Sequence, residues 1–73
     1  MNQKLKQIAK VIDLDLNLDD FYVIRIYDNL IHLQGEHNEV IQSHCEKIGY
    51  QFTTDGMFKV GTNHGIEITL VIQ

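Results

Sequence analysis

Four histidines and one cysteine are the side chains of this sequence that most often ligate zinc or take part in catalysis. They are His32, His37, His44, His64 and Cys45. No C-x-x-C or H-E-x-x-H spacing occurs among them. His37 and His44 fall on one predicted helix but two turns apart, about 10 Å in rise, which is too far for a shared ion. The sequence therefore predicts no metal site and no cofactor, and it favours a partly buried His44 with a hydrogen-bond partner.

Ser43, His44 and Cys45 are consecutive, as if a base stood beside two nucleophiles. Neighbours on a helix project about 100° apart and do not face each other, so the three side chains cannot act on one another. The sequence also lacks a nucleophile elbow, a P-loop and a dinucleotide-binding glycine pattern. We therefore expect that the protein is not an enzyme, that it has no catalytic residue, and that Cys45 packs as a small buried hydrophobe.

Asp13, Asp15 and Asn17 are spaced like the first ligands of an EF-hand calcium loop. That loop also needs glycine at its sixth position and glutamate at its twelfth, where this sequence has Leu18 and Ile24. We expect instead a solvated acidic connector whose leucines pack under the sheet. Its four carboxylates, which we call the acidic cluster, are Asp13, Asp15, Asp19 and Asp20.

The elements that would position these side chains begin with an amphipathic helix over residues 2–13. Its apolar positions Leu5, Ile8, Ala9 and Ile12 recur at i, i+3, i+4 and i+7. A second helix is predicted over residues 37–48, where apolar side chains recur at helical spacing and Gly49 stands at the C′ position. Residues 13–18 follow neither period and are left unassigned.

Strands are predicted over residues 21–27 and 30–35, joined by a two-residue loop, Asp28-Asn29. This loop pairs Ile26 with Ile31 and Ile24 with Leu33, and it places Tyr22 opposite Gly35. All six of these side chains then share the face that packs on the helices. The alternate residues of both strands would form the other face.

The last third of the chain has two glycine-containing turns, Thr54-Asp55-Gly56 and Asn63-His64-Gly65. Each is typical of a three-residue hairpin loop with a G1 bulge, so we expect a three-stranded meander. In this register Phe52 faces Phe58, and Thr62 faces Ile66. The residues that share the core face are then Tyr50, Phe52, Phe58, Val60, Ile66, Ile68 and Leu70.

A chain of 73 residues that is 44 % hydrophobic and 22 % charged has ordinary globular composition. We expect one small α+β domain over residues 1–73, with the order helix, two-stranded hairpin, helix, three-stranded meander, an antiparallel sheet and two helices on one face. Its folded surface should be about 4,700 Å². The longest apolar run is four residues and the lone cysteine excludes an internal disulfide, so we expect a cytoplasmic protein that does not enter a membrane.

The sheet face left bare by the helices is the feature from which we predict function. A solvated face is normally polar, whereas this one is about half apolar and contains the aromatic, arginine and methionine side chains typical of interface cores. The residues predicted to bind a partner are Phe21, Val23, Arg25, Tyr27, His32, Met57 and Lys59.

Small size, acidity and the bare face together favour a non-enzymatic protein-binding domain that acts as an inhibitor or adaptor of a larger protein. Its most concrete version is a phage or mobile-element protein directed at host nucleic-acid or defence machinery, with the acidic cluster meeting a basic groove. Two alternatives stay open, namely a module that stacks single-stranded nucleic acid on the bare face and a homodimer formed through that face. The net charge of −4 disfavours direct nucleic-acid binding.

Overall fold

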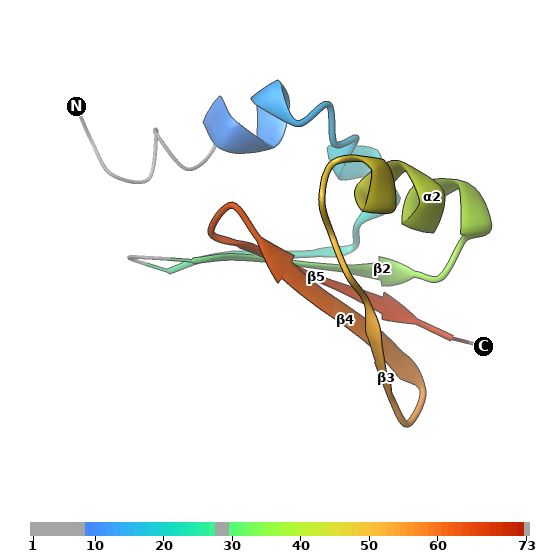
Figure 1. Cartoon of the computed structure of the whole chain (residues 1–73). Helices are drawn as coiled ribbons and strands as arrows, with labels where there is room; N and C mark the ends of the chain where they lie inside the picture. The colour runs from blue at the N-terminus through green and yellow to red at the C-terminus, as the bar shows by residue number, and fades with distance from the viewer. Residues whose placement is uncertain (1–8, 28–29, 73) are drawn as a thin grey trace.

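The computed structural model describes residues 9–27 and 30–72. Figure 1 shows the described helices on one side of a twisted sheet and none of them on the other side. The fold is α+β, as predicted, with five strands in the order β1-β2-β5-β4-β3. Its elements are a helical segment at residues 9–13, a 3₁₀ helix η1 (Leu18–Asp20), β1 (Val23–Ile26), β2 (Ile31–Glu36), α2 (Glu39–Lys47), β3 (Thr53–Asp55), β4 (Phe58–Asn63) and β5 (Ile66–Val71).

The sheet is mixed, whereas the sequence predicted an antiparallel one. β2 and β5 are parallel neighbours, with Leu33 beside Ile68, and the other three pairings are antiparallel. Parallel neighbours need a long crossover connection. Here α2, β3 and β4 form that connection, and α2 lies over the sheet (Figure 1). This order brings together the two strands with the most fully buried side chains.

The first hairpin has the predicted register from Ile24 opposite Leu33 to Ile26 opposite Ile31, but the predicted pairing of Tyr22 with Gly35 on the core face is wrong. The predicted loop, residues 28–29, lies outside the described residues. The alternation breaks before Val23, because Tyr22 N donates to Gln34 O at 2.9 Å although Val23 is the pairing partner of Gln34. Two residues oppose one, which is a β-bulge. Upstream of it the side chains change faces.

The meander has shorter loops than predicted, and the predicted registers are wrong. Asp55 pairs with Phe58 across Gly56-Met57, and Asn63 pairs with Ile66 across His64-Gly65. In the second turn both residues have positive φ, 56° and 73°, as a type I′ turn requires. The first strand of that hairpin, β4, is displaced by one residue against β5, so the side chains of β4 lie on the face opposite to the one predicted.

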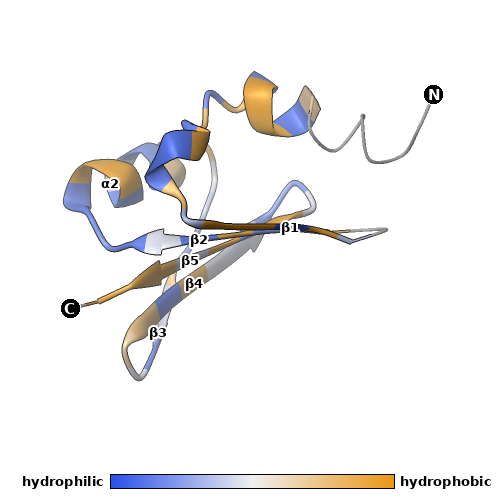
Figure 2. Cartoon of the chain, turned by 180° about the vertical axis from the view of Figure 1, so that it is seen from behind, coloured by the Kyte–Doolittle hydropathy of each residue, from blue (hydrophilic) through white to orange (hydrophobic). Residues whose placement is uncertain are grey.

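The core lies between the helices and the covered face of the sheet. Figure 2 shows strongly hydrophobic residues along β1 and β5 and on the helical segments above them. The buried apolar side chains are Val11, Leu16, Phe21, Ile31, Leu33, Cys45, Tyr50, Ile66, Ile68 and Leu70. The Tyr50 hydroxyl lies within 3.1 Å of Asn63 O and 3.0 Å of Ile66 O, which ties the chain after α2 to the last hairpin.

The structure agrees with the second predicted helix better than with the first. α2 begins after Asn38, whose side chain accepts from Val40 N at 2.7 Å, and Gly49 beyond its end has φ 103°, so this prediction is confirmed to within two residues. Of the predicted first helix, residues 2–8 lie outside the described residues. Within residues 9–13 the predicted apolar arc is wrong, because Val11 is 3 % exposed while Ile12 is 68 % exposed.

Candidate functional site

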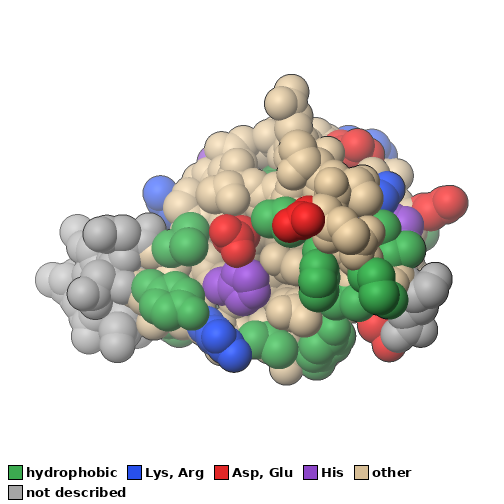
Figure 3. All heavy atoms as spheres, turned by 90° about the horizontal axis from the view of Figure 1, so that it is seen from below, with side chains coloured by type: hydrophobic (Ala, Val, Ile, Leu, Met, Phe, Trp, Pro, Cys, Tyr) green, Lys and Arg blue, Asp and Glu red, His purple; other side chains and the backbone are tan. Residues whose placement is uncertain are grey.

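The open face is the side of the sheet that no described helix covers, and its rows follow from the strand pairing. Each row crosses the sheet from strand to strand. One row is Arg25, His32, Glu67 and Thr62; the next is Val23, Gln34, Thr69, Val60 and Thr53; the third is Glu36, Val71, Phe58 and Asp55. In Figure 3, which shows this side, hydrophobic side chains gather around basic, acidic and histidine side chains.

A polar group occupies one end of the open face. His32 Nδ1 lies 2.8 Å from Glu67 Oε1, across the parallel pair β2 and β5. Arg25 is the cross-strand partner of His32 on its other side. The three side chains therefore place a cation, an imidazole and a carboxylate in a row, and the described part of the face has no other Lys or Arg.

The rest of the open face mixes apolar side chains with polar ones, the polar ones being Gln34, Glu36, Thr53, Asp55 and Thr69. Tyr22 is 61 % exposed, and its hydroxyl lies 3.4 Å from Gln34 Nε2. Phe58 is 42 % exposed, and Val60 and Val71 beside it are partly buried. The sequence missed Tyr22 and Phe58 because a bulge and a shorter turn put them on this face, and neither departure has a signal of its own in the local residue pattern.

The structure brings four of the seven predicted partner-binding residues together. Val23, Arg25 and His32 lie on the open face by their pairing, and Tyr27 continues the alternation beyond Arg25 and is 49 % exposed. Met57 lies in the turn between β3 and β4, at the end of the sheet.

The predicted open-face positions of Phe21 and Lys59 are wrong. Phe21 is a buried core side chain, because the bulge at Tyr22 and Val23 reverses the alternation before it. Lys59 lies on the covered face, where its Nζ donates to Gln42 Oε1 of α2 at 3.2 Å. The two-residue turn after β4 causes this reversal, since it displaces the pairing of β4 by one residue.

The acidic cluster lies on the helix side of the molecule, so the sheet separates it from most of the open face. Its four carboxylates are all exposed. The segment turns sharply at Asp15, whose φ is 57°, and again in η1, where Asn17 caps the helix by accepting from Asp19 N at 3.1 Å. The two groups of residues predicted from the sequence therefore form two separate surfaces.

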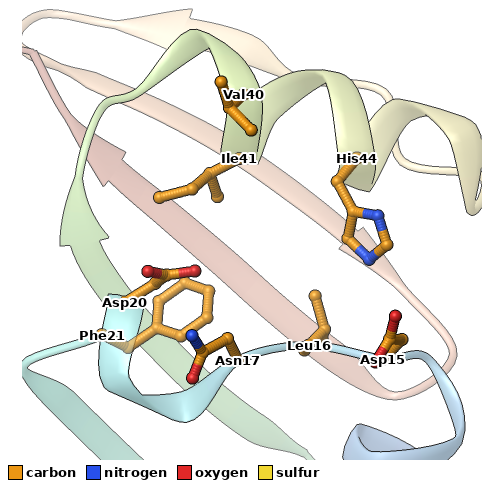
Figure 4. A pocket seen from close by; sticks show the side chains of 8 residues that line it. All are labelled: Asp15, Leu16, Asn17, Asp20, Phe21, Val40, Ile41 and His44. Carbon is orange, nitrogen blue, oxygen red and sulfur yellow. The ribbon is translucent and has the colours of Figure 1, made fainter.

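Beside the acidic cluster a pocket of about 240 Å³ opens between residues 15–21 and α2. Figure 4 shows side chains from both segments pointing into it. Its lining residues are Asp15, Leu16, Asn17, Asp20, Phe21, Val40, Ile41 and His44. The sequence did not predict this pocket, since residues 13–18 were left unassigned; the alternation of leucine with Asp or Asn there was the available signal.

His44 and Cys45 adopt the environments predicted from the helical spacing. His44 is partly buried, and its Nε2 lies 3.3 Å from Leu14 O, which can only accept. Cys45 is fully buried. Burial, and then the charges of Asp20 and Glu46, raise the pKa of the Cys45 thiol to about 11. A thiol with a raised pKa is a poor nucleophile at neutral pH.

Among residues 9–27 and 30–72, no three His, Cys, Asp or Glu side chains lie close enough together to hold a metal ion. Within the same ranges no helix has the length and apolarity that crossing a bilayer requires. Comparison with known protein families, curated proteins and solved structures found no match to this chain.

Proposed function

We propose that this protein is a non-enzymatic protein-binding domain, an inhibitor or adaptor that acts in the cytoplasm and holds its partner on the open face. The observation that carries this proposal is a five-stranded sheet that the described helices cover on one side only. Its other side presents Tyr22, Arg25 and Tyr27 at the β1 edge and Phe58 farther across on β4. Aromatic and arginine side chains are the residues that most often dominate binding energy in protein interfaces.

The size of the surface fits this function. A standard interface buries about 800 Å² on each partner, roughly a sixth of the 4897 Å² that this chain exposes. The central residue Thr69 is only 7 % exposed, so the middle of the face is already packed and the side chains around it form a nearly continuous surface. A rigid sheet that presents such a surface loses little conformational freedom on binding.

The position of Lys59 favours a protein over a nucleic acid as the partner. With Lys59 on the covered face, Arg25 is the single Lys or Arg side chain that the described residues place on the open face. Backbone phosphates need several such cations. The finer version, a phage or mobile-element inhibitor whose acidic cluster enters a basic groove, requires a partner that reaches around the sheet, because that cluster lies on the helix side.

A capture experiment with matched variants tests the proposal. Tagged protein is incubated with lysate from its native source, with and without nuclease, and bound proteins are identified by mass spectrometry. We expect one protein to persist after nuclease, and its affinity to fall roughly 30-fold in Arg25→Ala or Phe58→Ser, as for hot-spot residues. Ile12→Ser, which alters an apolar side chain on the helix side that is 68 % exposed against 42 % for Phe58, should have no effect.

Two outcomes would contradict the proposal. Enrichment that vanishes with nuclease would favour the nucleic-acid module. A partner that binds the open-face variants and the wild-type chain equally well would show that another surface makes the contact.

A further inference from the structure

We propose that the pocket between residues 15–21 and α2 binds an alkylammonium or guanidinium group, that is, a cation at the end of a short aliphatic chain. This pocket lies on the helix side of the sheet and shares no residue with the open face. The inference therefore goes beyond the proposed function and does not depend on it.

The floor of the pocket is apolar and suits an aliphatic chain. Leu16 and Phe21 are buried core residues that line it, and Ile41 of α2 lies across from them. Val40, next to Ile41, also lines the pocket, and it is 77 % exposed because no described residue covers it. A volume of about 240 Å³ is below the roughly 300–1,000 Å³ of pockets that enclose drug-sized ligands, so the occupant is about the size of one side chain.

The polar groups of the pocket are mostly hydrogen-bond acceptors, and two of them are charged. The side chains of Asp15 and Asp20 lie at two separate positions among the residues that line the pocket (Figure 4). His44 Nε2 donates to Leu14 O at 3.3 Å, so this nitrogen is already used within the chain. The amide nitrogen of Asn17 is the one side-chain donor left, since its oxygen accepts from Asp19 N.

No cation among the described residues neutralises the two carboxylates. No Lys or Arg lines the pocket, and neither Asp15 nor Asp20 makes a hydrogen bond or ion pair through its side chain there. The charge of Asp20 also acts on the core, because it contributes to the raised pKa of the Cys45 thiol. A ligand with a positive end and several N–H donors matches this set of acceptors, and an anion is repelled by it.

Backbone geometry brings the two carboxylates to one cavity. The left-handed conformation of Asp15 turns the chain, and η1 turns it again before Asp20. Asp13 and Asp19 belong to the same segment and are also exposed, yet they do not line the pocket. They supply matched controls, since substituting any of the four removes one negative charge from the same short segment.

The test is a titration of ¹⁵N-labelled protein followed by two-dimensional NMR, with N-acetyl-lysine N-methylamide as the probe. We expect shift changes confined to residues 15–21 and 40–44. Asp15→Asn and Asp20→Asn should each weaken binding about tenfold, the scale of a lost charged hydrogen bond, while Asp13→Asn and Asp19→Asn should change it less than about twofold. N-acetyl-norleucine N-methylamide, which has the same chain without the charge, should bind at least about tenfold more weakly.

Further arms distinguish the source of the cation. If n-butylammonium or n-butylguanidinium binds as tightly as a lysine- or arginine-containing peptide, the ligand is a small amine or guanidine; tighter peptide binding indicates a side chain of a protein. The proposal is overturned if no localised shifts appear up to the solubility limit of the probes. It is also overturned if the norleucine compound binds equally well, or if the Asp13 and Asp19 variants weaken binding as much as the pocket variants.

Discussion

Cys45 is a titratable residue that is buried in the core, so its ionisation is linked to folding. The Cys45 side chain projects from α2 into the core and is fully buried. Its pKa is raised from 9.0 to about 11, first by burial and then by the charges of Asp20 and Glu46. Burial also raises the pKa of Tyr50, which packs in the same core. Both groups stay neutral in the folded chain at a pH where they would ionise in the unfolded chain.

This difference predicts a loss of stability at alkaline pH. Between pH 9 and about 11 the folded state keeps a thiol proton that the unfolded state has lost. The contribution of Cys45 to the free energy of unfolding is therefore fully present below pH 9 and decreases as the pH rises toward 11. The decrease due to Cys45 should be on the order of 2 kcal/mol. Urea unfolding at a series of pH values measures it.

Cys45→Ala is the control for this prediction. The variant should be less stable at neutral pH, because it leaves a small cavity, but its free energy of unfolding should fall less between pH 9 and 10. Equal slopes for the variant and the wild-type chain in that interval would show that Cys45 is not the group responsible.

At the scale of elements, the sequence predicts helix α2 to within two residues and the pairing of Ile24 and Ile26 in the first hairpin correctly. In both places the hydrophobic residues recur with a period that one arrangement satisfies. The pattern around Cys45 fits one helical face, and Ile24 and Ile26 can face Leu33 and Ile31 in one register only. The later turn Asn63-His64-Gly65 is ambiguous, because its glycine suits either a three-residue loop with a bulge or a two-residue type I′ turn. The pairing of β4 with β5 decides between them, and that is a tertiary contact.

The candidate site inherits these errors of register. Since the side-chain period of a strand is two, one residue of loop length moves Lys59 to the covered face and Phe58 to the open face. The bulge at Tyr22 likewise moves Phe21 from the open face to the covered face. The sequence thus identifies the open face as a surface but assigns only Val23, Arg25, Tyr27 and His32 to it correctly.

Gly35 is the position where the segment before β1 packs on the sheet. A Cβ at Gly35 would overlap the carbonyl oxygen of Asp20 and lie 3.3 Å from the Phe21 ring. We therefore expect Gly35→Ala to destabilise the protein by roughly 1–3 kcal/mol, the cost of overpacking, and to speed hydrogen exchange of Leu16 and Phe21.

Gly56→Ala is the matched control, since Gly56 has φ 61° but no atom within 4 Å of an added Cβ. It should cost roughly 1 kcal/mol through backbone conformation alone, and it should leave exchange at Leu16 and Phe21 unchanged. If the two variants have the same exchange pattern, the segment before β1 does not depend on Gly35.

For the whole molecule, size scaling predicts a folded surface of about 4,700 Å², and the structure exposes 4897 Å². Size scaling gives the total area only and does not say which side chains occupy which face of the molecule. The acidic cluster and the pocket lie on the helix side, and Arg25 and the exposed aromatic side chains Tyr22, Tyr27 and Phe58 lie on the open face. Only the three-dimensional arrangement separates them, because in the sequence Asp20 and Tyr22 are two residues apart.

Net charge and the open face together predict how copies of the chain behave in solution. At pH 7 each chain has a formal charge of −4, and mutual repulsion opposes contact between two open faces. We expect light scattering to give the monomer mass of 8.5 kDa across a dilution series. Near the sequence pI of 5.3 the repulsion disappears, and the chains should associate.

The surface responsible for that association can be identified with two variants. Phe58→Ser should reduce association near pH 5.3 because it removes an aromatic side chain from the open face, whereas Ile12→Ser, on the helix side, should reduce it less. A dimer mass that persists at pH 7 down to the lowest concentration would contradict the expected monomer. If Phe58→Ser also restored the monomer mass, the open face would be a contact between two copies of this chain, and the case for a separate protein partner on it would fall.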